Sequence, residues 1–164
     1  MTQSLWIMRH GQAAAGSPDE RRELTAQGRE EVALMADWLA RSLTPAQAAG
    51  LRIAASPYVR AQQTASIVAE RFGKRVETLE LITPDDSVEA VIDWLQADKA
   101  GQAAWLLVSH MPLVGSLTGR LVERDPRSQL PMPTAAIAVL EADVWAAGCA
   151  ELRTFRHPAD FASQ

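Results

Sequence analysis

Three short, mainly apolar runs constrain the fold of this chain more than any other feature of its sequence. They cover residues 5–8, 51–55 and 105–108. The first run shows no alternation of apolar and polar residues, which is typical of a strand covered on both faces of a sheet. Helical patterns separate the runs, and this alternation favours an α/β fold, a three-layer α/β/α sandwich with a mostly parallel central sheet. The last strands, near residues 135–140 and 151–155, are free to pair antiparallel.

Residues that favour helix N-termini precede the segments with helical periodicity. Thr25 is the predicted N-cap of a helix that runs to about residue 41. We expect Ser56 to cap a second helix with Pro57 as its first residue, and Pro112 to open a further helix. Helix and strand thus alternate along the chain.

The length and composition indicate an ordinary globular protein. A chain of 164 residues is close to the commonest domain size, so we expect residues 1–164 to form a single domain, and we expect a monomer. The net charge of −4 argues against nucleic acid or an anionic membrane surface as the main partner. Cys149, the only cysteine, excludes an internal disulfide and indicates a reducing compartment. Without a long apolar stretch or a recognisable signal peptide, we expect the protein to be cytoplasmic.

Each apolar run ends on residues suited to binding or attacking a phosphoryl group. The first run precedes Arg9 and His10, the second precedes Ser56 and Arg60, and the third precedes His110. In an open parallel sheet the ligand crevice lies beyond the carboxyl ends of the strands. We therefore expect two arginines and two histidines to meet there, in a positive pocket on a mildly acidic protein.

His10 is the candidate nucleophile. A neutral imidazole can take a phosphoryl group onto one ring nitrogen, provided that a partner on the other nitrogen, such as a backbone carbonyl, fixes the tautomer. Gly11 follows it and has no side chain that could block a ligand. The alternative is a histidine that packs or binds water at the end of a strand.

Arg9, Arg60 and His110 are the candidate phosphoryl-binding residues. A guanidinium binds two phosphoryl oxygens at once. Arg60 falls in the first turn of its predicted helix, where a cation opposes the helix dipole by about 0.3 to 1 kcal/mol, so a bound anion explains it better than helix stability. His110, if protonated, would share the charge on the transferred oxygens. The alternatives are a solvated Arg60 and a structural His110, and we expect His157 to be a surface residue.

The motifs resemble those of a known family. Met8, Arg9, His10 and Gly11 are similar to the signature of the histidine phosphatase superfamily, which has the phosphoglycerate mutase-like fold. Further matches follow in order along nearly the whole chain: Leu24, Thr25 and Gly28; Ser56, Pro57, Arg60, Ala61, Gln63 and Thr64; Leu79, Glu80, Thr83 and Pro84; Ser109, His110, Pro112, Leu113, Val114 and Gly115. Together they look most like the small SixA-type phosphohistidine phosphatases.

The resemblance implies a phosphatase that needs no metal and no other cofactor. In such an enzyme His10 would carry the phosphoryl group transiently, Arg9, Arg60 and His110 would bind that group, and water would release it. The implied substrate is phosphohistidine on signalling or phosphocarrier proteins. Two other functions stay open: a small-molecule phosphomonoesterase of the same superfamily, and a module that binds phosphorylated ligands without catalysis.

The short connection between residues 79 and 87 bears on the substrate. Larger members of the superfamily carry there an acid that protonates an alkoxide leaving group, together with segments that roof the pocket. A short connection predicts an open site that a protein side chain can enter, and a phosphorylated imidazole has less need of an enzymic acid. Glu80 is the first candidate for such an acid. Asp85 and Asp86 are further candidates, although both are also typical of a turn and a helix N-terminus.

Two residues beside the motifs have no assigned role. Gln12 stands where some relatives have an acidic residue. Arg22, just before Leu24 and Thr25, either reaches the substrate or extends into solvent.

Overall fold

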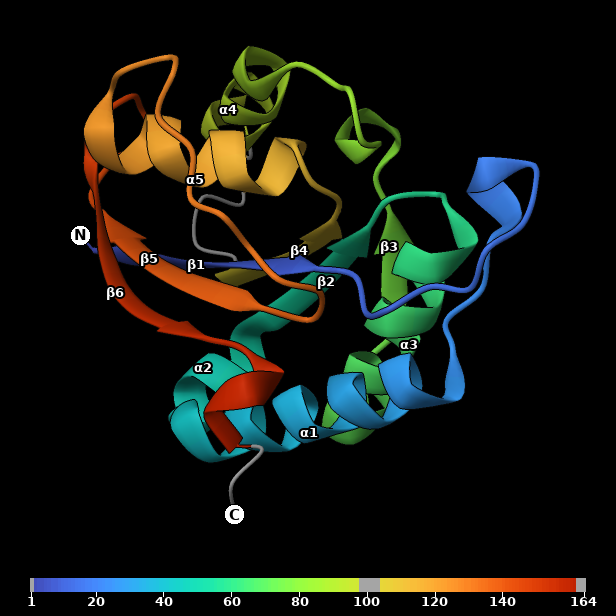
Figure 1. The fold of residues 1–164 in the computed structure, drawn as a ribbon. Coiled ribbons are helices and arrows are strands. Elements are labelled where there is room, and N and C mark those ends of the chain that lie inside the picture. Colours follow the sequence, from blue (N-terminus) through green and yellow to red (C-terminus); the bar gives the residue numbers. More distant parts are fainter. Residues whose placement is uncertain (1, 98–103, 162–164) are drawn as a thin grey trace.

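The computed structural model describes residues 2–97 and 104–161, which form a six-stranded sheet with helices on both faces (Figure 1). From one edge to the other, the strands are β3 (Val76–Thr78), β2 (Leu51–Ala55), β4 (Ala104–Ser109), β1 (Gln3–Arg9), β5 (Ile137–Ala142) and β6 (Ala150–Arg156). The first four run parallel, whereas β5 pairs antiparallel with β1, and β6 with β5. The prediction of a mostly parallel sheet with antiparallel last strands is confirmed.

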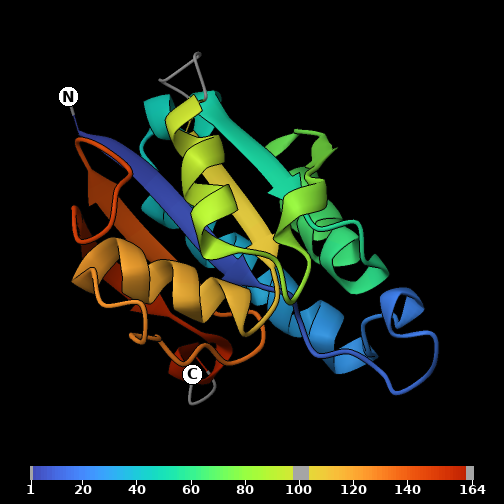
Figure 2. The same cartoon turned by 90° about the horizontal axis from the view of Figure 1, so that it is seen from above.

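The helices make three layers with the sheet (Figures 1 and 2). On one face lie α1 (Ala26–Ser42), α2 (Pro45–Gly50) and α3 (Val59–Phe72), and on the other lie α4 (Val88–Ala97) and α5 (Leu113–Glu123). Three short 3-10 turns complete the connections: η1 (Asp19–Arg21), η2 (Glu80–Ile82) and η3 (Pro158–Phe161). The predicted α/β/α sandwich is confirmed. Among the described residues, no helix combines the length and the apolar character that crossing a membrane requires.

The central strand β1 shows why its apolar run is unbroken. Trp6 and Met8 pack in the core on the side of α1 and α3, whereas Leu5 and Ile7 pack in the core on the side of α4 and α5. All four side chains are buried. Burial of a side chain of this size stabilises a fold by roughly 1.5–3 kcal/mol. The run therefore fills both core layers, and this fixes β1 in the middle of the sheet.

Two of the predicted helix starts are confirmed. Thr25 is the N-cap of α1, and its hydroxyl accepts a hydrogen bond from Gly28 N–H at 2.9 Å. α5 begins at Leu113, directly after Pro112.

The predicted start of the second long helix is wrong. α3 begins at Val59, so Ser56 is not its cap and Pro57 is not its first residue. Ser56 is held elsewhere, because its N–H donates to Val108 O at 3.0 Å and its hydroxyl lies 2.8 Å from His110 Nε2. The segment before α3 is thus a turn fixed to the end of β4.

The parallel strands β1, β2 and β4 end at the same edge of the sheet. Arg9, the last residue of β1, pairs with Ser109, the last residue of β4, and Ala55 at the end of β2 pairs with Val108. The pairing continues beyond β1, since His10 N–H donates to Ser109 O at 2.9 Å. Residues that follow these three strands are therefore neighbours in space.

Candidate active site

The predicted site residues lie at this edge of the sheet. Arg60 Nε lies 3.3 Å from His10 Nε2, and the rings of His10 and His110 are edge to face with their centroids 5.1 Å apart. Arg9 directly precedes His10 at the end of β1. His10, Arg60 and His110 are all buried. The topology thus brings together side chains that are far apart in the sequence.

His10 carries its proton on Nδ1. That nitrogen lies 2.7 Å from Gly11 O, and because a carbonyl oxygen can only accept, Nδ1–H is the donor. Nε2 then holds the lone pair, which accepts from Arg60 Nε–H. Burial, together with the charges of Arg60, Arg9 and Arg22, lowers the pKa of His10 to about 4 against the opposing effect of the Gly11 carbonyl. The ring is therefore neutral at pH 7, and the lone pair on Nε2 has the chemistry that a nucleophile needs.

The segment that follows β1 is fixed against two helices. Gly11 N–H donates to Thr64 Oγ1 of α3 at 3.0 Å, and the Thr64 hydroxyl donates to Arg60 O at 2.8 Å. A Cβ on Gly11 would lie 2.6 Å from Val32 Cγ2 of α1, closer than non-bonded atoms pack. The missing side chain of Gly11 thus lets the backbone beside His10 lie directly on α1.

Arg60 lies in the first turn of α3, as predicted, and its side chain is only 6% exposed. Its Nη1 donates to Asp19 O at 2.7 Å, and its Nη2 donates to Asp19 Oδ2 at 3.1 Å. The guanidinium carbon also lies 5.0 Å from the centroid of the Tyr58 ring, a cation–π distance. These contacts hold the guanidinium beside His10 and keep it out of bulk solvent.

His110 has a buried nitrogen without a partner. Its Nε2 lies 2.8 Å from Ser56 Oγ, and Ser56 Oγ also accepts from Tyr58 N–H at 3.2 Å. Donation of the hydroxyl proton to Nε2 satisfies Ser56 and leaves the imidazole proton on Nδ1. Among the described residues, this Nδ1 has no hydrogen-bond partner. Burial, with smaller effects of charge on His10 and Arg60, lowers the pKa of His110 to about 3, so the ring is neutral at pH 7 in the free protein.

Arg9 offers a second unsatisfied N–H group. Its Nη1 donates to Met132 O at 2.8 Å, but its buried Nε has no partner within the part of the chain that the structure describes. Burial, helped by the charge of Arg60, lowers the pKa of Arg9, which still leaves a cation at pH 7. A buried polar group without a partner costs about 1–3 kcal/mol. An anionic oxygen that bound Arg9 Nε or His110 Nδ1 would remove that cost.

Two of the three carboxylates proposed as acids have no contact with this cluster among the hydrogen bonds and ion pairs of the described residues. Glu80 is exposed on η2, and within residues 2–97 and 104–161 it makes no hydrogen bond or ion pair with the four site residues. Asp86 accepts from the N–H and the hydroxyl of Thr83 at 2.7 and 2.6 Å, so it shapes the turn before α4. His157, whose side chain is 28% exposed, follows β6 and is separated from β1 by β5.

Gln12 and Arg22 both have partners within the protein. Gln12 Oε1 accepts from the hydroxyl of Thr25 at 2.6 Å, so Gln12 supports the start of α1. Arg22 Nη1 donates to Asp19 Oδ1 at 2.9 Å. Arg22 is therefore linked to the site through the carboxylate that also binds Arg60.

Three residues that shape the site have roles that the sequence patterns missed. Thr64 is part of the motif around Arg60, but its spacing also suits a buried helix stripe. Ser56 suits a helix cap equally well. Asp19 stands in a charged loop without periodicity, where no signal in the sequence marks it.

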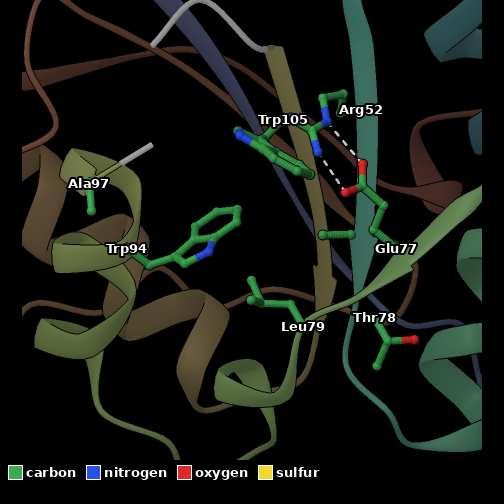
Figure 3. Close-up of a pocket in the computed structure, with 8 residues that line it drawn as sticks. Arg52, Glu77, Thr78, Leu79, Trp94, Ala97 and Trp105 are labelled. Carbon is green, nitrogen blue, oxygen red and sulfur yellow. Dashed lines mark hydrogen bonds and ion pairs between the residues drawn. The ribbon is translucent and has the colours of Figure 1, made fainter. Parts of the chain in front are cut away.

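A separate hollow of about 330 Å³ lies between β2, β3, β4 and α4 (Figure 3). The rings of Trp94 and Trp105 form part of its wall, with centroids 4.9 Å apart. Arg52 beside it is paired with Glu77 at 2.7 and 2.9 Å. None of the four predicted site residues lines this hollow. Within the described ranges, no group of three or more His, Cys, Asp and Glu side chains could hold a metal ion.

Comparison with known sequences agrees with the motifs. The family model described as "Histidine phosphatase superfamily (branch 1)" matches residues 5–83. The phosphohistidine phosphatase SixA homolog of Haemophilus influenzae is 37% identical in an alignment of 142 residues that covers 82% of this chain and 87% of the relative. The phosphohistidine phosphatase SixA of Escherichia coli is 38% identical over 144 residues, 85% of each chain. This chain belongs to the histidine phosphatase superfamily. The resemblance to SixA-type proteins is thereby confirmed.

Solved structures of the superfamily have the same fold. The protein histidine phosphatase SixA complexed with tungstate superposes with a TM-score of 0.84 at 32% identity, over 97% of this chain and 99% of that one. The mycobacterial glucosyl-3-phosphoglycerate phosphatase superposes with a TM-score of 0.67 at 16% identity, over 94% of this chain and 98% of that one. The second likeness shows the fold alone.

Proposed function

We propose that this histidine phosphatase removes the phosphoryl group from phosphohistidine on signalling or phosphocarrier proteins. The observation that carries the proposal is the tautomer of His10, whose Nε2 lone pair is presented beside Arg60 while Gly11 O holds the proton on Nδ1. Two relatives named for phosphohistidine phosphatase activity, each aligned over more than four fifths of this chain, support the substrate class.

The proposed reaction has two steps. In the first, His10 Nε2 forms a bond to phosphorus, and the P–N bond of the substrate breaks; the leaving imidazole keeps the electron pair and takes a proton from water. The His10 ring is then cationic, and Nδ1–H still donates to Gly11 O. In the second step, water attacks phosphorus and loses a proton to solvent, and the electron pair of the breaking bond returns to Nε2. The products are inorganic phosphate and neutral His10.

Arg9, Arg60 and His110 would stabilise the phosphoryl group during both transfers. The two guanidinium groups neutralise the charge of its oxygens, and Arg9 Nε–H and His110 Nδ1–H supply donors that are unused in the free protein. A dianion beside His110 raises the pKa of that ring, because opposite charges favour the protonated form. Binding of the ligand therefore favours the protonated, cationic form of His110.

The second candidate function, a small-molecule phosphomonoesterase, needs a proton donor for an alkoxide. Glu80 is the first candidate for that role by position, but it is exposed, and within the described residues it has no hydrogen bond or ion pair with the four site residues. The carboxylate that does reach the site is Asp19, and hydrogen bonds from Arg22 and Arg60 lower its pKa, which makes it a poor acid at pH 7. A protonated imidazole is a better leaving group than an alkoxide, so this arrangement favours phosphohistidine.

We also propose that the chain acts as one domain and as a monomer, without a cofactor, in a reducing compartment such as the cytoplasm. The support is that β1 to β6 form one sheet and that Cys149, the single cysteine, is exposed and has no second cysteine with which to pair.

The decisive experiment compares two substrates. Initial rates are measured on a histidine-phosphorylated phosphocarrier protein and on p-nitrophenyl phosphate. We expect kcat/KM to be at least about tenfold higher on the phosphoprotein, since a phosphorylated imidazole has less need of an enzymic acid than an ester. A clear preference for the ester would replace the proposal by the phosphomonoesterase.

The same assay tests the role of His10. His10→Ala should reduce turnover by at least about a thousandfold, because the nucleophile is lost, while binding of inorganic phosphate stays measurable. His157→Ala is the matched control and should keep the wild-type rate. A wild-type rate in His10→Ala would exclude His10 as the nucleophile. If the wild-type protein turned over neither of the two substrates, the non-catalytic binding module would be favoured.

A further inference from the structure

Asp19 brings a negative charge into a site whose other charged groups are positive. Its Oδ2 accepts from Arg60 Nη2 at 3.1 Å and its Oδ1 accepts from Arg22 Nη1 at 2.9 Å, so one carboxylate bridges two arginines. The Asp19 side chain is 53% exposed, whereas that of Arg60 is 6% exposed. Asp19 therefore lies on the solvent side of Arg60, at the rim of the site.

Only one guanidinium group separates this carboxylate from the nucleophile. Arg60 donates its Nε–H to His10 Nε2. It also donates from Nη1 to the backbone carbonyl of Asp19 and from Nη2 to the Asp19 carboxylate. A phosphoryl group that approaches His10 must share Arg60 with Asp19. The second arginine matters here, because Arg22 binds Asp19 Oδ1 independently of Arg60 and so gives the carboxylate a second fixed partner.

The charge of Asp19 acts differently on different phosphoryl ligands. Free phosphate and small anionic esters bring their whole negative charge close to the carboxylate, and like charges at such distances repel. A phosphoryl group on an imidazole brings the same charged oxygens, but its leaving ring is cationic when protonated, and attraction between that ring and the carboxylate offsets the repulsion. In an in-line transfer the leaving ring would lie opposite His10 Nε2, toward solvent, where the half-exposed Asp19 carboxylate also lies.

We propose that Asp19 is a specificity-determining residue that weakens the binding of inorganic phosphate and of anionic phosphate esters relative to phosphohistidine. The inference rests on the proposed function and deepens it, since it names the group that separates substrate from product. A site built only from Arg9, Arg60 and His110 would retain the released phosphate. The carboxylate of Asp19 opposes that retention.

The test removes the charge of Asp19 and keeps its hydrogen bonding. In Asp19→Asn the side-chain oxygen can still accept from Arg60, and the backbone carbonyl is unchanged. We expect the dissociation constant for inorganic phosphate, measured by calorimetric titration without any substrate, to fall by about tenfold at low salt. The inhibition constant of phosphate in the turnover assay should fall in parallel, whereas KM for the phosphoprotein should change by less than about threefold.

Glu20→Gln is the matched control. Glu20 is the neighbouring exposed acid on η1, and within the described residues it has no ion pair with Arg60 or Arg22. The Glu20→Gln variant should leave phosphate binding unchanged. Since it changes the net charge by the same amount as Asp19→Asn, it separates the local effect of the Asp19 carboxylate from the effect of net charge. Asp19→Ala removes the hydrogen bond as well as the charge, and it should tighten phosphate binding to a similar extent.

Unchanged or weaker phosphate binding in Asp19→Asn would overturn the inference. So would a change confined to Asp19→Ala, because Asp19 would then only position Arg60. Equal tightening in Glu20→Gln would overturn it too. The titration needs no turnover, so a wild-type protein that fails to hydrolyse phosphohistidine disproves the proposed function independently of this result.

Discussion

At the scale of single residues, burial and hydrogen bonding oppose each other on the catalytic candidate His10. Burial disfavours the charged ring, whereas the Gly11 carbonyl favours a protonated Nδ1, and the balance gives a pKa of about 4. His110 is neutral for the same primary reason, with a pKa of about 3. The site therefore holds two neutral, buried imidazoles beside two arginines at pH 7.

This balance predicts how stability depends on pH. Below about pH 6.5 the unfolded chain binds protons on His10 and His110, while the folded protein does not until the pH approaches 4. The free energy of unfolding should therefore fall as the pH drops from 6.5 to about 4, by up to about 1.4 kcal/mol per pH unit for each histidine. Urea unfolding of the wild type and of His10→Gln between pH 7 and 4.5 measures this.

The variant isolates the contribution of one ring. The pH slope of His10→Gln should be smaller than that of the wild type by up to about 1.4 kcal/mol per pH unit, since the variant loses the titration of one buried ring. Identical slopes would show that His10 is not held neutral by the fold.

Residues that follow strands could be predicted from the sequence, whereas their supporting partners could not. Arg9, His10 and His110 come directly after apolar runs, and parallel strand ends must meet. Asp19 lies in a loop whose course depends on tertiary contacts with Arg60 and Arg22. Loop contacts of this kind leave no periodic pattern in the sequence.

At the scale of elements, the site depends on the contact between the segment after β1 and the helix α1. A Cβ on Gly11 would lie 3.0 Å from Gly28 O and 2.6 Å from Val32 Cγ2. Gly28 permits a second close approach, since a Cβ there would lie 2.2 Å from Gln12 O. Two glycines thus let the backbone beside His10 pack directly on α1.

We predict that Gly11→Ala destabilises the fold. The added methyl must displace Val32, so the free energy of unfolding should fall by about 1–3 kcal/mol in urea titrations. Gly50→Ala is the control, because a Cβ at Gly50 meets nothing within 4 Å and the variant should keep wild-type stability. The double variant Gly11→Ala, Val32→Ala should lose less stability than the sum of its parts. Equal stability of Gly11→Ala and the wild type would contradict the packing described.

The elements also differ in how far the sequence predicts them. α1 has many turns and a clear cap at Thr25, and both appear in its residue pattern. α2 has six residues, too few for helical periodicity, although Thr44 and Gln47 form a capping box that marks it. The sequence pattern predicts the start of α3 at the wrong residue, because Ser56 and Pro57 suit a turn and a helix start equally well.

At the scale of the whole molecule, a protein of net charge −4 gathers two arginines and two histidines at the carboxyl edge of its parallel strands. The sheet order β3-β2-β4-β1 places β4 between β1 and β2, so His110 lies between His10 and the turn before Arg60. This order was not predictable from one sequence. The alternation of strands and helices predicted the layers, and the motifs then predicted which edge carries the chemistry.

If His10 Nε2 is the phosphoryl acceptor, a phosphoenzyme forms during turnover, and trapping it identifies the residue that carries the phosphoryl group. The protein is mixed with a histidine-phosphorylated donor protein, quenched in base within milliseconds to seconds, and digested for mass spectrometry. The account predicts one acid-labile, base-stable phosphoryl group on His10, attached to Nε2, and none in His10→Ala. A phosphoryl group on His110 or on a hydroxyl side chain, or turnover without any labelled His10, would contradict it.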